Sequence, residues 1–185
     1  MDTEISVSNC GYEGIKRVLL GENEIKQAVQ KLGRRITEEY AGKPLLILGI
    51  LNGCFIYLSD LCREIKMPCE VAFMSAKSYG DGTVSSGNVK IELDIKKDIS
   101  KYHVIIAEDI VDTGRTLSAI CEMLRERNPL SLKVAALLDK PERRTVDFKA
   151  DYTLFTVPDL FVVGYGLDCG EKYRNLPFIA EAELD

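Results

Sequence analysis

The sequence contains few of the residues that metal centres and disulfide frameworks need. It has no tryptophan and one histidine, His103, which leads into an apolar segment, so a histidine-based zinc site is not expected. Its six cysteines form no C-x-x-C pair, and most lie among apolar residues, where a free cysteine behaves as a small hydrophobic side chain. We therefore expect ordinary reduced thiols.

Long apolar runs and blocks of one charge are missing as well. The longest apolar run, residues 44–51, is far shorter than the roughly 20 residues that cross a membrane. The 24 basic and 29 acidic residues are interspersed, so the net charge of −5 leaves no basic patch for nucleic acid. The first residues lack the basic and apolar regions of a signal peptide. These features predict a cytoplasmic protein with no membrane or nucleic-acid partner.

The chain has the length and patterning of one α/β domain covering residues 1–185. Two strand–helix–strand units are expected, and they favour a mainly parallel central sheet flanked by helices on both faces. A helix over 22–40 precedes the units, and a short strand follows them. The expected segments are strand 45–50, a helix from Cys54 to near Pro68, strand 69–75, strand 103–107, a helix with its apolar face over 117–124, strand 131–138 and strand 161–166.

Ligands of such sheets bind beyond the carboxyl ends of the strands, which here are 52–53, 108–116, 139–140 and 166–168. Between the two units, residues 76–90 hold three glycines and three serines and show no apolar periodicity. A long polar loop inside a compact domain is disordered or functional, and a flexible lid is its usual functional form.

The segment VIIAEDIVDTGRTLSAI (104–120) joins an apolar strand to three acids, a hydroxyl-rich turn and a helix. It has too few glycines and no lysine for a Walker loop or a dinucleotide fingerprint. Its D-T-G triplet also occurs in aspartic proteases, but those are all-β, whereas this triplet opens a helix.

Different parts of the same segment suit an anion and a metal ion. Backbone N–H groups and hydroxyls of 113–116 suit a phosphate at a helix N-terminus. Glu108 and Asp109 suit ribose hydroxyls and hydrated Mg²⁺. A plain helix start, where acids are favoured by the macrodipole, explains one or two of the carboxylates but not the whole pattern.

VIIAEDIVDTGRT resembles the phosphoribosyl-pyrophosphate (PRPP) binding motif of type I phosphoribosyltransferases. Serine-tyrosine at 78–79, LLDKPERR at 137–144 and PDLFVVGYGLDCGEKYRNLP at 158–177 narrow the resemblance to the hypoxanthine(-guanine) phosphoribosyltransferases. The match runs in order from about residue 15 to about residue 180. It implies the type I phosphoribosyltransferase fold, with a small hood from the terminal segments, and a homodimer or homotetramer.

The resemblance implies a purine salvage enzyme that transfers the phosphoribosyl group of PRPP to N9 of a 6-oxopurine base and releases pyrophosphate. Glu108 and Asp109 would hold the ribose hydroxyls and meet Mg²⁺. Asp168 would serve a second Mg²⁺ carried in with pyrophosphate, although it could instead cap a helix starting near Gly170. Arg174 would help to bind the pyrophosphate.

The same resemblance assigns the purine and phosphate contacts. Asp112 would act as general base on N7 of the purine or stabilise its proton. The turn that would hold the 5′-phosphate consists of Thr113, Gly114, Arg115 and Thr116. Lys140 would donate to the 6-oxo group, which disfavours adenine, although alone it could be a solvated turn lysine. Phe161 would stack on the base unless it belongs to the core, and the backbone of Val162 would read the purine edge.

Two loops complete the implied site. Ser78 and Tyr79 lie in the expected lid, where Tyr79 would shield the activated sugar from water. The family usually has Leu-Lys-Gly after the first strand of its first unit, in a pyrophosphate loop that often contains a cis peptide, whereas this chain has Leu51-Asn52-Gly53. The backbone can still bind the anion, but a cationic side chain is lost at Asn52.

Two other functions remain open from the sequence. One is a non-catalytic regulator on the same scaffold that senses PRPP or nucleotides and binds RNA or protein. The presence of both Asp112 and Lys140 argues against this function. The other is a sister enzyme for xanthine, adenine or a pyrimidine. Lys140 argues against adenine, and the sequence does not separate xanthine from guanine.

Overall fold

The structure, a computed structural model, describes residues 12–78 and 89–183. Within these residues the chain forms one sheet of six strands in the order β4-β3-β2-β5-β6-β7 and one of three strands in the order β1-β9-β8. The strands are β1 (Ile15–Leu20), β2 (Leu45–Leu51), β3 (Glu70–Ser78), β4 (Val89–Leu93), β5 (His103–Val111), β6 (Ser131–Asp139), β7 (Tyr152–Thr156), β8 (Val162–Val163) and β9 (Ile179–Ala182). The helices are α1 (Glu22–Glu39), α2 (Phe55–Glu64), α3 (Arg115–Arg125) and a short 3₁₀ helix, η2 (Pro141–Arg143).

The large sheet is parallel except at one edge. Strands β2, β3, β5, β6 and β7 pair in parallel, and β4 pairs antiparallel with β3. Strand β2 is apolar along its whole length because helices cover both of its faces. The predicted mainly parallel α/β sheet is therefore confirmed, with both strand–helix–strand units present.

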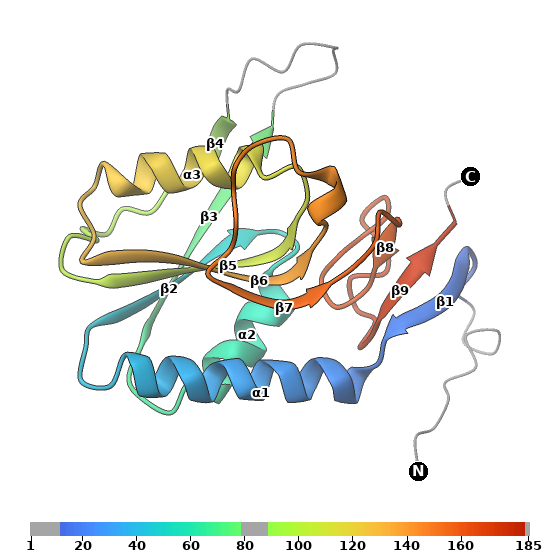
Figure 1. The fold of residues 1–185 in the computed structure, drawn as a ribbon, viewed down its shortest axis with the longest axis horizontal. Helices are drawn as coiled ribbons and strands as arrows, with labels where there is room; N and C mark the ends of the chain where they lie inside the picture. Colours follow the sequence, from blue (N-terminus) through green and yellow to red (C-terminus); the bar gives the residue numbers. More distant parts are fainter. Residues whose placement is uncertain (1–11, 79–88, 184–185) are drawn as a thin grey trace.

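Helices cover the two faces of the large sheet, as Figure 1 shows, with α1 and α2 below it and α3 above it. The apolar side of α1 places Ile25, Val29, Leu32 and Ile36 in a core with α2 and one face of the sheet. The apolar side of α3 packs Leu117, Ile120, Cys121 and Leu124 into a second core on the other face. Burial on both faces fixes which end of each strand carries the polar loops.

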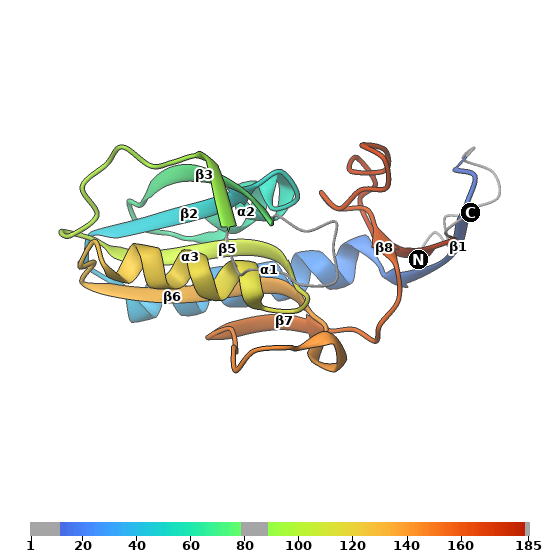
Figure 2. The ribbon, with the colours of Figure 1, turned by 90° about the horizontal axis from the view of Figure 1, so that it is seen from above.

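The small antiparallel sheet joins the two ends of the chain beyond one end of the large sheet (Figure 2). Strand β9 pairs with β1, where Ile15 lies opposite Ala182, and with β8, where Val163 lies opposite Ala180. This is the hood expected from the terminal segments, and the fold expected from the resemblance is confirmed.

Three predicted boundaries were wrong. Strand β5 continues through Glu108 and Asp109 to Val111, because its ladder with β6 continues to the pair Val111 and Asp139. The expected lid loop 76–90 begins and ends in β3 and β4, which pair through Ser78 and Val89, and its centre, 79–88 with Tyr79, lies outside the described residues. The strand expected over 161–166 shrinks to β8, because Gly164, Tyr165 and Gly166 all have positive φ.

The cysteines and the histidine are structural, as expected. The five cysteines within the described residues are free thiols, and those of Cys62 and Cys69 are hydrogen-bonded to each other. His103 Nδ1 lies 2.8 Å from Oγ of Ser131, and its ring packs edge-on against Tyr40. Among the described residues, no helix is both long and apolar enough to span a membrane. The cytoplasmic location stays a prediction.

Candidate active site

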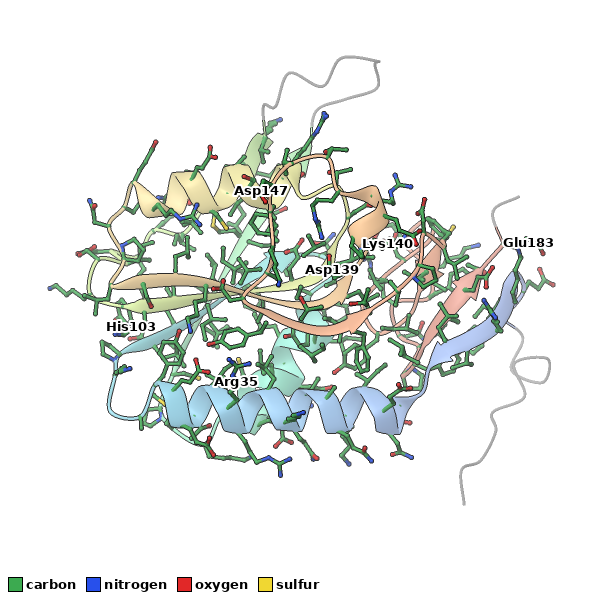
Figure 3. The ribbon with its side chains drawn as sticks, viewed as in Figure 1. Arg35, His103, Asp139, Lys140, Asp147 and Glu183 are labelled. Carbon is green, nitrogen blue, oxygen red and sulfur yellow. The ribbon has the colours of Figure 1, made fainter. Side chains whose placement is uncertain are left out.

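The carboxyl ends of the parallel strands bring the predicted segments together at one end of the large sheet. Figure 3 shows Asp139 and Lys140 at the end near the small sheet, and His103 at the opposite end. The backbone N–H of Lys140 donates to the carbonyl of Val111 at 2.9 Å, which joins the end of β6 to the end of β5. Candidate residues from 108–116 and 139–140 therefore share one edge.

The Asn52-Gly53 loop packs directly against this edge. A Cβ atom on Gly53 would lie 1.5 Å from Oδ2 of Asp109, so only glycine fits there without moving the carboxylate. A Cβ on Gly166, whose φ is +105°, would lie 2.0 Å from the carbonyl oxygen of Gly53. The peptide bond between Leu51 and Asn52 is cis, as the resemblance led us to expect. Segments 52–53 and 166–168 thus meet beside Asp109.

Glu108 and Asp109 form a crowded acidic pair. Among the described residues, Oε2 of Glu108 is shielded from solvent and has no hydrogen-bond partner. Burial raises the pKa of Glu108 well above its ordinary value, and the charge of Asp109 adds to this effect. Burial also raises the pKa of Asp109 to about 6, against a hydrogen bond from the N–H of Ile110 that favours the charged form. Burial is therefore the main effect on both carboxylates, and it disfavours their charged forms.

Asp168 and Arg174 complete this acidic side. Nη2 of Arg174 lies 3.0 Å from Oδ1 of Asp168, and its Nη1 donates to the carbonyl of Gly166 at 2.9 Å. Arg174 lowers and Asp168 raises the pKa of Asp109, so the three groups lie close to one another. The alternative role of Asp168 as a helix cap is wrong, because no helix starts near Gly170 among the described residues. Its Oδ2 instead accepts from the N–H of Glu171 in a turn.

The segment 113–116 forms the turn that the sequence predicts. Gly114 caps α3 in the left-handed conformation with φ of +82°, and the helix begins at Arg115. Its carbonyl accepts from the N–H of Ser118 at 2.9 Å, whereas the carbonyl of Thr113 accepts from the N–H of Thr145. The first N–H groups of α3, with the hydroxyls of Thr113 and Thr116 beside them, form a helix N-terminus suited to a phosphate.

Lys140 contacts the segment after Pro158, where the base pocket is expected. Lys140 is 8% exposed, and its Nζ donates to the carbonyl of Leu160 at 2.5 Å. It is therefore not a solvated turn lysine. Phe161 is 36% exposed, so its alternative assignment to the core is wrong and its ring is available for stacking. The neighbouring Val162 is buried in β8.

Comparison with known proteins shows the family to which this chain belongs. A family model for the phosphoribosyl transferase domain matches residues 19–169. A hypoxanthine-guanine phosphoribosyltransferase from Streptococcus pneumoniae is 49% identical over 165 residues, 89% of this chain and 92% of that protein. A hypoxanthine phosphoribosyltransferase from Salmonella typhimurium is 46% identical over 169 residues, 90% of this chain and 95% of that protein. The chain belongs to the hypoxanthine phosphoribosyltransferase family.

A solved structure agrees with this assignment. The crystal structure of a hypoxanthine phosphoribosyltransferase from Staphylococcus aureus has a TM-score of 0.89 and 45% sequence identity, and the match covers 92% of both chains. As a member of the hypoxanthine phosphoribosyltransferases, this chain is a phosphoribosyl-transferring enzyme, and the expectation of an enzyme is confirmed.

Sequence analysis missed the basic residues that hold this phosphoribosyltransferase site in shape. Nη1 of Arg144 donates to the backbone carbonyl of Asp112 at 2.7 Å, and its Nη2 forms a hydrogen-bonded ion pair with Asp139. Nε of Arg143 lies 2.6 Å from Oδ1 of Asp112, and Nη1 lies 3.3 Å from Oδ1 of Asp159. The two adjacent arginines in LLDKPERR were a signal that could have pointed to these contacts.

The carboxylates fit Mg²⁺ in one binding mode. No group of three or more His, Cys, Asp or Glu side chains among the described residues is arranged as a metal cage. Mg²⁺ is commonly held by one or two carboxylates together with water and substrate phosphates, which suits the crowded pair Glu108 and Asp109. The prediction assigned Asp168 to a different ion, so the absence of a cage does not contradict it.

Proposed function

We propose that this phosphoribosyltransferase transfers the 5-phosphoribosyl group of PRPP to N9 of hypoxanthine and guanine, forming IMP or GMP and pyrophosphate in purine salvage. One observation carries the proposal. Within this family fold, the backbone N–H of the buried Lys140 donates to the carbonyl of Val111, the residue before Asp112, so a cationic side chain and a carboxylate lie at neighbouring strand ends. A 6-oxopurine presents a carbonyl acceptor and an N7 proton, which match these two groups.

The reaction uses the two sides of the site separately. The bond from C1 of the ribose to pyrophosphate breaks as the bond from C1 to N9 forms, and positive charge develops on the sugar. Asp112 takes the proton from N7, so that the purine bonded to C1 through N9 is neutral in the nucleotide product. The N–H groups and hydroxyls of 113–116 hold the 5′-phosphate in place. Phe161 stacks on the base, and the backbone of Val162 reads its edge.

The acidic side holds the ribose and the leaving group. Glu108 and Asp109 accept hydrogen bonds from the ribose hydroxyls, and they bind Mg²⁺ directly or through water, with Asp168 serving a second ion. Bound Mg²⁺ neutralises the charge that develops on pyrophosphate. Arg174 and the backbone N–H groups of Asn52 and Gly53 add donors for the same anion. Ser78 and Tyr79 belong to the segment that we expect to exclude water from the activated sugar.

The test is turnover with a panel of bases. The protein is incubated with PRPP, Mg²⁺ and hypoxanthine, guanine, xanthine, adenine or uracil in turn, and nucleotide and pyrophosphate are quantified. We expect both products in equal amounts with hypoxanthine and guanine. Tight PRPP binding without turnover on any base would contradict the proposal and favour the regulator. Turnover confined to xanthine, adenine or uracil would favour a sister enzyme.

We also propose that the protein is a homodimer or homotetramer. Support comes from an apolar surface on the α2 side of the sheet edge, where Val71, Phe73 and Leu93 are each at least 40% exposed. These side chains lie on one face because Ser75, two residues beyond Phe73, pairs with Leu93. Phe55, 43% exposed at the start of α2, is a further apolar side chain on this side. Patches of this kind mark protein contacts. Light scattering of wild type and Phe73→Asp tests the proposal. A monomeric wild type would contradict it, and an unchanged mass in Phe73→Asp would show that this surface is not the contact.

A further inference from the structure

The candidate base Asp112 is held by a neighbour that no motif assigns. Nε of Arg143 lies 2.6 Å from Oδ1 of Asp112. Arg143 belongs to the 3₁₀ helix η2, directly after Lys140, whereas Asp112 follows β5. The contact therefore links the two segments that face the purine pocket from different strands.

The two oxygens of Asp112 have different surroundings. Oδ1 is shielded from solvent, and its contact with Arg143 is an ion pair rather than a well-aligned hydrogen bond. The side chain as a whole is nevertheless 44% exposed, so its accessible surface lies on Oδ2 and the adjoining carbons. In a carboxylate held in this way, one oxygen is accessible to a ligand and the other contacts the protein.

Arg143 is itself anchored on the segment that leads into β8. Its Nη1 lies 3.3 Å and 3.5 Å from the two carboxylate oxygens of Asp159, two residues before Phe161. The carboxylates of Asp159 and Asp112 together raise the pKa of Arg143, so its charge is secure. The carbonyl of Asp112 is held separately by Arg144 at 2.7 Å. Backbone and side chain of Asp112 are thus positioned by two adjacent arginines.

We propose that Arg143 is a positioning residue for the proton-transfer step. Anchored on Asp159, it fixes Oδ1 of Asp112 and so directs Oδ2 towards N7 of the bound purine. The inference rests on the proposed function, because it needs Asp112 to act on the purine. A proton acceptor must be held within hydrogen-bond reach of its proton, so loss of the anchor slows the chemical step more than it weakens PRPP binding.

Arg143 can be substituted with little expected effect on stability. The side chains of Arg143 and Asp159 are each 46% exposed, and ion pairs at this exposure contribute little to stability. Arg143→Ala is therefore expected to fold as stably as wild type. Arg17→Ala is the matched control, since Arg17 is an exposed arginine paired with Glu181 in the small sheet.

The experiment measures kcat and both KM values for IMP formation. We expect Arg143→Ala to lower kcat about 10-fold with KM for PRPP within about twofold of wild type, and Arg143→Lys to recover part of the loss. Asp159→Asn is expected to lower kcat about threefold, and Arg17→Ala to change nothing. An unchanged or higher kcat in Arg143→Ala would overturn the inference.

A double mutant shows whether Arg143 acts through Asp112. In an Asp112→Asn background, adding Arg143→Ala is expected to lower kcat by less than about twofold, because the effect of the anchor is already lost. A further loss as large as in the wild-type background would overturn the inference. A wild-type protein that turns over no 6-oxopurine would instead contradict the proposed function, so the two failures are distinguishable.

Discussion

Gly53 and Asp109 lie so close that a single methyl group between them would overlap the carboxylate. The added Cβ would be 1.5 Å from Oδ2 and 2.6 Å from Cγ of Asp109. Asp109 is in β5, and its backbone is held by the ladder to β6 on either side of it. An added methyl group would therefore have to displace the Asp109 side chain or the loop, so the anion loop and the acidic pair are in direct contact.

Gly53→Ala should move the anion loop and Asp109 apart. We expect kcat/KM for PRPP to fall by at least about 100-fold, because the loop or Asp109 must leave its place. The control is Gly21→Ala, where an added Cβ meets nothing within 4 Å and φ is not positive. Circular dichroism checks that both variants fold. Wild-type kcat/KM in Gly53→Ala would show that the close contact has no functional role.

Lys140 should decide between 6-oxo and 6-amino purines. Removing a charged donor from a buried site costs about 1.5–3 kcal/mol, so Lys140→Met is expected to lower kcat/KM for hypoxanthine by about 10- to 150-fold. The rate with adenine, which offers no acceptor at this position, should change little. Lys16→Met, an exposed lysine in β1, serves as control. Equal losses for both bases would argue against a contact with the 6-oxo group.

Asn52 stands where the family usually has lysine, and restoring the cation should strengthen PRPP binding. A charge near the surface contributes about 1 kcal/mol, so Asn52→Lys is expected to lower KM for PRPP about fivefold at low ionic strength. The gain should shrink as salt is added. Asn52→Met, which has similar length and no charge, separates charge from size. An unchanged or higher KM in Asn52→Lys would reject the idea.

Glu39 links α1 to the far end of the sheet and should make stability sensitive to acid. A hydrogen bond from Tyr152, then those from Arg35 and Lys133, lowers the pKa of Glu39 to about 2 (Arg35 is labelled in Figure 3). A carboxyl group with a lowered pKa stabilises the fold above its unfolded pKa of about 4.5, and that contribution is lost as the pH falls towards 2.

Glu39→Gln is therefore expected to lower the free energy of unfolding by about 1–2 kcal/mol at pH 7 and by much less at pH 3. Urea denaturation at both values measures this, with the exposed Glu38→Gln as control. A loss of the same size at both pH values would mean that the charge of Glu39 is not responsible.

The central sheet could be predicted because its strands are short apolar runs between turn residues. Segments such as 45–50 and 131–138 differ from β2 and β6 by a single residue. In the small sheet only β8 left such a signal, and the hood was expected from the resemblance alone, because Ile15 pairs with Ala182 across almost the whole chain. Strand β4 was likewise missed, because it begins within the end of the polar stretch that suggested a lid.

The site was predictable to the extent that its residues lie in continuous motifs. Asp109, Asp112 and Lys140 were found from the strand ends and the resemblance. The contacts of Arg143 and Arg144 were not, because they join residues about 30 positions apart across irregular backbone, where no periodicity records which side chains meet. The exposure of Phe161 likewise could not be predicted from its apolar neighbours, because Val162 and Val163 beside it are buried.

The most direct test of the account is the stoichiometry of the reaction with hypoxanthine. Phosphorus NMR follows PRPP, IMP and pyrophosphate in one sample with Mg²⁺, for the wild type and for Asp112→Asn. We predict that PRPP is converted one-to-one into IMP and pyrophosphate, only when hypoxanthine is present, and at least about 100-fold more slowly by Asp112→Asn. Persistence of PRPP with the wild type, or equal rates for the two proteins, would contradict the account.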